Sequence, residues 1–253
     1  MSSSKELKIG VLLTAPVQLL DFAPIDLFAM ATPEYLSLCN IPPPIVSLAK
    51  PCKIYNIGKK SASSTDNESD KDRKIQQVTA TSGIVLTHTT ADKEVAPGNL
   101  DVLFLPGPDP NTIPDEETQE FLRAHNEHNT TILVICTAAY TAGYSGIYDG
   151  RHASGPKFLI PELQKKFPKA KWNNTLRWVQ DGNIWSAGGI TNGNDLVAAY
   201  LRATYPGPVA EMVCTMADVG DRALEYDVGM RRGMLFVLWQ VIKALPSYIF
   251  RLK

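Results

Sequence analysis

The stretch that decides the fold is Thr131-Ile-Leu-Val-Ile-Cys-Thr-Ala-Ala139. Four consecutive apolar residues lead directly into Cys136, which is the pattern of a strand buried on both faces. Thr137 then opens an Ala-rich segment that is predicted to be helical as far as Tyr148. A strand that turns at once into a helix at a nucleophilic residue is typical of a nucleophile elbow. The stretch therefore predicts a strand of a parallel sheet and a candidate site at Cys136.

Further strands and helices alternate along the rest of the chain. The predicted strands are Lys8–Thr14, Ile45–Ala49, Ile54–Ile57, Asp101–Pro106 and a hairpin over Leu176–Ala187 that turns at Asp181-Gly182. The predicted helices are Asp26–Ala31, Glu116–His128 behind an N-cap at Asp115, Phe158–Phe167, Asn194–Ala203 and Val209–Ala217. This alternation predicts an α/β protein, a three-layer sandwich whose mostly parallel sheet lies between helices.

The composition limits the classes of partner. The chain has 253 residues and a net charge of −1, so it lacks the basic excess of a nucleic-acid-binding protein. The four cysteines, at positions 39, 52, 136 and 214, lie far apart and without zinc-ligand spacing. We expect free thiols, no metal and no cofactor. The first residues have no signal-peptide pattern, which predicts a cytoplasmic location and leaves the nucleus open.

Two segments stand apart from this pattern within a predicted single domain, 1–253. Residues 58–74 are Ser-rich, charged and almost without large apolar side chains, so we expect a disordered insertion. Residues 229–253 form a predicted C-terminal helical extension. Its apolar run is too short for stable membrane insertion, and we expect it to pack on the fold. Its basic residues leave contact with a membrane surface as an alternative.

Cys136 has two interpretations from sequence alone. If Cys136 stands at a helix N-terminus, its thiol would face free N–H groups. These groups would lower the pKa of the thiol and stabilise developing negative charge. Alternatively, it is a small residue that ends a buried strand, because free cysteine is among the most buried residue types. The other three cysteines have no such context and are predicted to be structural.

Several segments together resemble the DJ-1/PfpI (ThiJ) superfamily, and within it the isonitrile hydratase-like branch. They are residues 17–28, Asp101–Gly107, Ile135–Thr137, Gly146–Ala153 and Arg177–Asp195, and they span most of Lys8 to Tyr205. No single segment is diagnostic, but their order and spacing match the superfamily. The resemblance implies a flavodoxin-like sheet of the class I glutamine amidotransferase type and a homodimer.

The resemblance also implies roles for individual residues. Cys136 matches the elbow cysteine, and Thr137 follows it as a donor through its N–H and hydroxyl groups. Asp21 matches an acidic residue that handles protons beside the thiol, although a helix-capping role is an alternative. Asp195 matches a second acidic position, with a helix N-cap or first-turn charge as its alternative. Gly107 matches a glycine loop that lends N–H groups to the substrate pocket.

Two departures from the family pattern concern the same site. Pro156 occupies the position where many relatives place a histidine near the cysteine, and His152 lies four positions earlier. Pro108 replaces a second glycine and removes one backbone donor from the pocket. The remaining histidines, at positions 88, 125 and 128, are predicted to be solvated.

The function implied by this resemblance is the cysteine-dependent hydration of an isonitrile, a small-molecule substrate, to an N-substituted formamide. A glyoxalase III or deglycase activity is the second hypothesis, and the missing histidine disfavours it. The third is a redox-sensing stress protein in which Cys136 is oxidised to a sulfinate.

Overall fold

A seven-stranded sheet forms the centre of the molecule, in the strand order β10-β11-β7-β6-β1-β2-β5. The structure is a computed structural model that describes residues 5–60, 77–79 and 83–251. The strands are β1 (Leu7–Leu12), β2 (Cys52–Gly58), β5 (His88–Thr89), β6 (Val102–Leu105), β7 (Thr131–Ile135), β10 (Trp178–Asp181) and β11 (Ile184–Ala187). All neighbours in the sheet are parallel except β10 and β11, which form an antiparallel hairpin.

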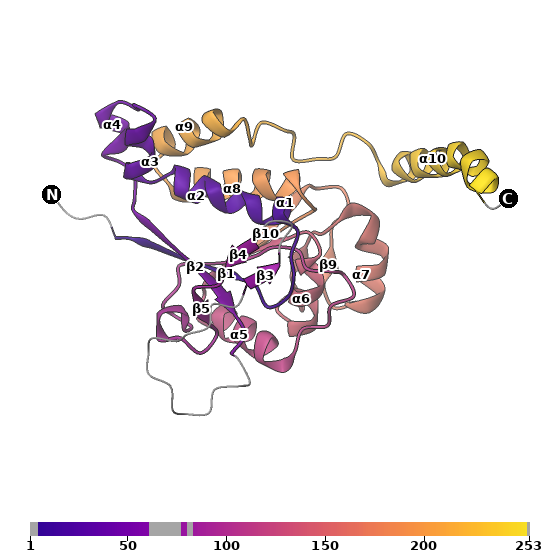
Figure 1. Ribbon diagram of the computed structural model, residues 1–253, viewed down its shortest axis with the longest axis horizontal. Coiled ribbons are helices and arrows are strands. Elements are labelled where there is room, and N and C mark those ends of the chain that lie inside the picture. Colours follow the sequence, from indigo (N-terminus) through magenta and orange to yellow (C-terminus); the bar gives the residue numbers. More distant parts are fainter. Residues whose placement is uncertain (1–4, 61–76, 80–82, 252–253) are drawn as a thin grey trace.

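Helices cover both faces of this sheet (Figure 1). One face carries α1 (Leu19–Phe22), α2 (Asp26–Met30), α8 (Thr191–Thr204) and α9 (Gly207–Ala217). The other carries α5 (Glu116–Glu127), α6 (Ala138–Ser145) and α7 (Ile160–Lys166). Alternate residues of β7 point to opposite faces: Leu133 and Ile135 join the first core, whereas Ile132 and Val134 join the second. The predicted three-layer α/β sandwich is confirmed.

Shorter elements complete the described chain. The helices are α3 (Pro33–Leu38), α4 (Pro43–Val46) and α10 (Met230–Arg251), with 3-10 turns η1 (Ala23–Ile25), η2 (Lys93–Val95) and η3 (Lys157–Leu159). The strands are the antiparallel pair β3 (Gln77–Thr79) and β4 (Gly83–Val85), and the parallel pair β8 (His152–Ala153) and β9 (Lys171–Trp172). Within the described ranges, no helix is long and apolar enough to cross a membrane.

Several local predictions can be compared with these elements. The Asp115 side chain accepts a hydrogen bond from the N–H of Thr118 and caps α5, and Gly182 turns the predicted hairpin with φ +62°. The strand predicted over Ile45–Ala49 is wrong, because Ile45 and Val46 belong to α4 and the next residues form the turn after it. Pro43 and Pro44 stand in the first turn of α4, where a missing N–H costs nothing. Residues 61–74 of the predicted insertion lie outside the described residues.

The C-terminal helix α10 does not pack on the fold as expected. It projects from the body at the end of an extended segment (Figure 1), and its apolar side chains are exposed. Only its first turn approaches the body, where Gly233 lies beside the Phe158 ring.

Candidate active site

Cys136 lies at the sharp turn between β7 and α6. Its φ is +57°, a left-handed conformation that is strained for a residue with a Cβ. Its N–H donates to the carbonyl of Ala187 at 3.2 Å, so the turn is held against the end of β11. Cys136 as a whole is only partly buried.

The Asp21 carboxyl group lies beside this thiol and has no solvent exposure. Oδ1 accepts a hydrogen bond of 2.8 Å from the N–H of Ile190. Oδ2 is buried without a nitrogen or oxygen donor among the described residues. The other group that interacts with the carboxyl is the Cys136 thiol. Asp21 belongs to α1 and does not cap it, so the capping alternative is wrong.

Ile190 holds its N–H toward Asp21 through an unusual backbone conformation. Its φ and ψ are +59° and −112°, an outlier for a β-branched residue. Backbone strain of this kind persists only where the surrounding structure fixes it, and it gathers at functional sites. Sequence reasoning missed Ile190, because its contribution is a backbone N–H and any residue type could supply one.

Two glycines bring these groups together. A Cβ on Gly107 would lie 2.6 Å from both Asp21 Oδ2 and Thr137 Oγ1, and 3.0 Å from the Cβ of Cys136. A Cβ on Gly189 would lie 2.8 Å from the Cys136 Sγ. Real Cβ contacts are essentially never closer than 3.0 Å. Both positions therefore need glycine so that the thiol and the carboxyl can approach each other.

Burial controls the protonation of the pair. Desolvation raises the pKa of the Asp21 carboxyl, and the hydrogen bonds from Ile190 and Cys136 oppose that rise. Desolvation, followed by the charge and hydrogen bond of Asp21, raises the pKa of the Cys136 thiol to about 12. The prediction of a lowered thiol pKa is wrong, because contacts with Thr137 oppose these causes without outweighing them. The resting sulfur is a thiol.

Thr137 supports the turn from the first position before α6. Its hydroxyl donates to the carbonyl of Pro108, which ties the elbow to the loop after β6. Both the N–H and the hydroxyl group of Thr137 lie near the sulfur and favour its charged form, but the hydroxyl group is shared with the Pro108 carbonyl, whereas the N–H is a donor without that competition.

Asp195 lies away from this cluster, in the second turn of α8. It is buried and pairs with the Arg222 guanidinium, which also donates to Asn192 Oδ1 at 3.2 Å. The two residues line a separate hollow together with Asp218 and Asp221. The structure thus brings Cys136, Asp21, Thr137 and Gly107 together but not Asp195. No acidic residue stands in the first turn of α8, so the capping alternative for Asp195 is also wrong.

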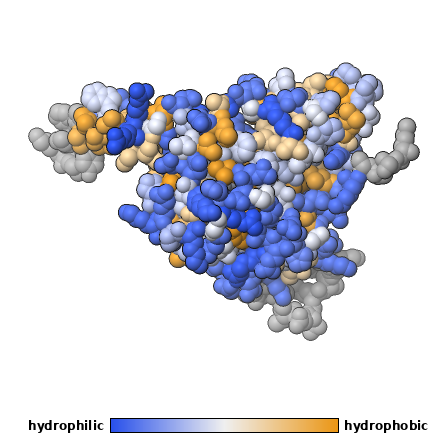
Figure 2. All heavy atoms as spheres, turned by 180° about the vertical axis from the view of Figure 1, so that it is seen from behind, coloured by the Kyte–Doolittle hydropathy of each residue, from blue (hydrophilic) through white to orange (hydrophobic). Residues whose placement is uncertain are grey.

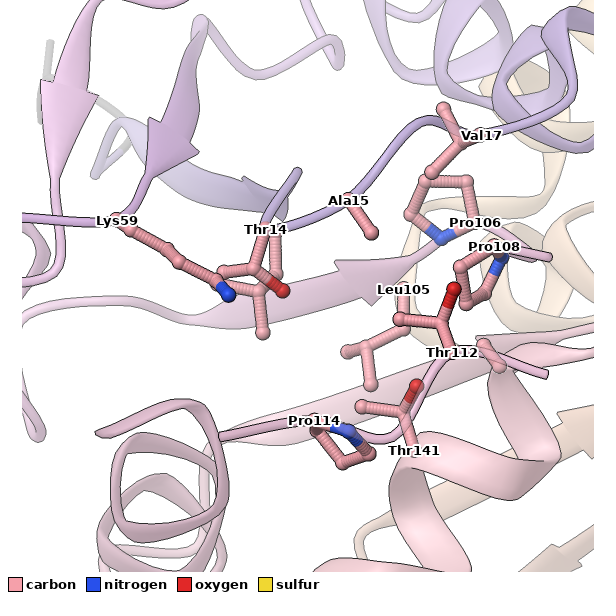
Figure 3. Close-up of a pocket in the computed structure, with 12 residues that line it drawn as sticks. Thr14, Ala15, Val17, Lys59, Leu105, Pro106, Pro108, Thr112, Pro114 and Thr141 are labelled. Carbon is pink, nitrogen blue, oxygen red and sulfur yellow. The ribbon is translucent and has the colours of Figure 1, made fainter. Parts of the chain in front are cut away.

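A pocket opens next to the elbow at the carboxyl ends of the parallel strands (Figure 3). Pro106 and Pro108 line it from the loop after β6, and Ala138 and Thr141 line it from α6. The Lys59 side chain reaches into it toward Thr14 and pairs with Asp115 at 2.8 Å. Ligands of open α/β sheets bind at this edge.

All four histidines lie in other surroundings. His152 is exposed on β8, His88 stacks edge-on against Tyr55, and His128 bonds the carbonyl of Ala124. His125 is fully buried, which contradicts the prediction that it is solvated. Within the described ranges, no group of three or more His, Cys, Asp or Glu residues could hold a metal ion.

The fold and the site define a class of protein: an α/β sandwich with a cysteine at the turn after a central strand and a buried carboxyl group beside it. The model of the DJ-1/PfpI family matches residues 54–203, which is more than half of the chain. The chain belongs to the DJ-1/PfpI family.

Individual relatives agree with this assignment. The isonitrile hydratase of Pseudomonas putida is 28% identical over 144 residues, which cover 54% of this chain and 58% of that protein. The chain thus spans less than two thirds of that curated relative. A ThiJ/PfpI family protein from Pseudomonas syringae superposes with a TM-score of 0.64 at 19% identity, covering 94% of this chain and 88% of that one. DJ-1beta of Drosophila melanogaster superposes with a TM-score of 0.62 at 15% identity, covering 85% and 99%.

Proposed function

We propose that this protein is a cysteine-dependent hydratase that converts an isonitrile to an N-substituted formamide. The observation that carries the proposal is the buried Asp21 carboxyl group beside the Cys136 thiol, with an Oδ2 that no nitrogen or oxygen donor of the described residues satisfies. The similarity to an isonitrile hydratase supports the substrate class.

The first half of the reaction forms a covalent intermediate. A thiol with a pKa of about 12 is a weak nucleophile at neutral pH, so it needs a base as the substrate approaches. Asp21, as the carboxylate, takes the Sγ proton while sulfur bonds to the isonitrile carbon. It then returns that proton to the same carbon, which gives a thioimidate, R–N=CH–S–Cys136. A raised Asp21 pKa favours the first transfer, because it makes the carboxylate a stronger base toward the thiol than an ordinary carboxylate.

The second half consumes one water molecule. Asp21 takes a proton from the water as the water oxygen attacks the thioimidate carbon, and then passes that proton to the substrate nitrogen. The C–S bond breaks as the C=O bond of the formamide forms, and the proton of the added hydroxyl group passes through Asp21 to the sulfur. The Thr137 N–H faces the sulfur and supplies the donor that stabilises its negative charge. The sum is R–NC plus water to R–NH–CHO.

The two alternatives lack support at the same site. The glyoxalase and deglycase hypothesis depends on a histidine beside the cysteine, and all four histidines lie in other surroundings. The redox-sensor hypothesis favours a cysteine with a low pKa, whereas burial and Asp21 raise the pKa of Cys136.

The test is formamide production from a simple aliphatic isonitrile. Wild type should turn over, and Cys136→Ala and Asp21→Ala should not. Cys39→Ala and Asp26→Asn are matched controls, because Cys39 and Asp26 are exposed to solvent; both variants should retain activity. Absence of turnover in wild type would reject the hydratase proposal.

The resemblance supports two further proposals, a homodimer and a cytoplasmic location. Light scattering on the purified full chain should give twice the mass of one chain, and a monomer mass would reject the dimer. Fractionation of cells should place the protein on the cytoplasmic side of their membranes.

A further inference from the structure

The C-terminal helix α10 presents apolar side chains that nothing in the described chain covers. Nine of them have between 44% and 64% of their surface exposed: Met234, Leu235, Phe236, Val237, Leu238, Trp239, Val241, Ile242 and Leu245. Figure 2 shows the helix projecting beyond the body, with orange apolar residues beside blue ones. Exposed apolar surface of this extent, gathered on one element, marks an interaction site.

The distribution of these residues around the helix indicates what kind of surface covers them. At 100° per residue, the polar side chains of Arg232, Gln240 and Lys243 fall within about 80° of one another, with Phe236 among them. The opposite sector, bounded around the circumference by Val237 and Trp239, covers about 200° and is apolar apart from Arg231 in the first turn. A helix that packs on a protein needs an apolar stripe of roughly 100°. The α10 sector is wide enough to be immersed, with a narrow polar stripe left for water.

The charge of this segment indicates the sign of its partner. Residues 229–253 contain five Lys and Arg and no Asp or Glu, which leaves 20 basic against 26 acidic residues in the rest of the chain. The tail is therefore +5 and the remainder −6. Arg231 and Arg232 stand at the start of α10, and the Lys243 ammonium lies 5.9 Å from the centre of the Trp239 ring. A basic stripe beside a tryptophan is typical of a helix at an anionic lipid interface.

The length of the apolar segment of α10 decides whether this helix can cross a membrane or only lie on its surface. Residues 234–245 are 12 residues and span about 18 Å at 1.5 Å per residue, against a hydrocarbon core of about 30 Å. The described chain holds no helix that could cross a membrane. We propose that α10 docks the protein on an anionic membrane surface, with its apolar sector among the acyl chains of one leaflet and its basic residues at the headgroups.

The proposal is tested by flotation of the full chain with lipid vesicles. Wild type should float with vesicles of phosphatidylcholine containing 30% phosphatidylserine and should bind pure phosphatidylcholine much more weakly. Leu238→Glu with Ile242→Glu, at the centre of the apolar sector, should lower binding at least tenfold. The matched control is Leu38→Glu with Leu48→Glu, which adds the same charge at exposed apolar residues of the body and should bind as wild type does.

Two further measurements distinguish the contribution of charge to vesicle binding from the contribution of apolar contact. Arg231→Gln with Arg232→Gln should weaken binding to the anionic vesicles by about fivefold per charge, because each basic residue near such a surface is worth about 1 kcal/mol. Trp239 emission should shift to the blue on binding, and Trp239→Phe should abolish the shift. The other tryptophans belong to the body and provide the unchanged background.

Three results would overturn the proposal. The first is wild-type protein that stays with the unbound fraction. The second is binding that depends on neither α10 nor lipid charge: Leu38→Glu with Leu48→Glu loses as much binding as Leu238→Glu with Ile242→Glu, or wild type binds neutral and anionic vesicles equally. The third is a stable dimer without vesicle binding that Leu238→Glu with Ile242→Glu converts to a monomer, which would assign α10 to a second copy of the chain. Isonitrile turnover is independent of all three.

Discussion

Two buried titratable groups, Asp21 and His125, lie near opposite ends of strand β7 and differ in their hydrogen bonds. Beyond its carboxyl end, Asp21 lies beside Cys136: one carboxylate oxygen accepts from the Ile190 N–H, and the other has no nitrogen or oxygen donor among the described residues. Before its amino end, His125 bonds at both ring nitrogens: Nε2 donates to the carbonyl of Val95 at 3.1 Å, and Nδ1 accepts from the Thr130 hydroxyl at 3.0 Å. Neither side chain has any solvent exposure.

The difference separates a group poised for chemistry from a group that holds the fold. A satisfied buried group stabilises one arrangement, whereas a buried polar atom without a partner costs free energy and needs a reason to be retained. For Asp21 the reason that we propose is a proton exchanged with the thiol during the reaction. Burial alone therefore does not mark a functional residue. Asp21 differs from His125 because its second carboxylate oxygen lies without a nitrogen or oxygen donor among the described residues, beside the Cys136 thiol.

The largest expected effect comes from Asp21→Asn. We expect turnover to fall by about 10² to 10⁴, the usual contribution of a proton-transfer group. Loss of the carboxylate also removes one cause of the raised Cys136 pKa, so alkylation by iodoacetamide at pH 8 should become faster. Stopped-flow turnover and alkylation rates measure the two effects. Slower alkylation in the variant would mean that the site had collapsed.

Gly189→Ala tests the close approach at the elbow. Its Cβ would lie 2.8 Å from the Cys136 Sγ, so the sulfur must move, and overpacking should cost about 1–3 kcal/mol of stability. Turnover and alkylation should both fall. Gly207→Ala is the matched control, because nothing lies within 4 Å of its Cβ at the start of α9. Chemical denaturation compares the two variants; an equal loss in both would contradict the geometric argument.

His125 should affect stability and not chemistry. Burial lowers its pKa from 6.5 to about 4, so the folded state keeps the ring neutral while the unfolded state takes up a proton. The stabilisation is complete above pH 6.5 and is lost as the pH falls toward 4. His125→Phe leaves the Val95 carbonyl and the Thr130 hydroxyl without their partner, at a cost of about 1–3 kcal/mol at pH 7.

Thermal unfolding between pH 4 and 8 measures this contribution. The variant should lose less stability than wild type over the acid range, and its turnover at pH 7 should match wild type. The same slope in both proteins would show that His125 does not titrate in this range.

Asp195 should produce the smallest effect on stability and sharpens the comparison. It is a buried carboxylate like Asp21, but the Arg222 guanidinium satisfies it. Asp195→Asn keeps hydrogen bonding and should cost about 1 kcal/mol of stability, with turnover within about threefold of wild type. Steady-state kinetics and denaturation of the same preparation measure both. A loss of turnover as large as that of Asp21→Asn would assign Asp195 to the reaction.

The parts of the structure that the sequence predicts correctly are those fixed by residues close to one another in the chain. The apolar run Thr131–Ile135 could only be a buried strand, and the Asp115 N-cap fixed the start of α5. The strand predicted over Ile45–Ala49 failed because proline chemistry favoured a helix there. His125 was misplaced because its partners, Val95 and Thr130, are supplied by neighbouring segments.

The sequence by itself determined the order of strands and helices and the position of Cys136 at a turn, because hydrophobic periodicity and capping act over a few residues. Only the tertiary structure brought Ile190 to Asp21 across 169 positions and left Gly189 against the sulfur. It also decided the direction of the thiol pKa: a helix N-terminus favours the thiolate, but burial beside a carboxyl group disfavours it more strongly. Desolvation depends on every neighbour at once, and the sequence does not name those neighbours.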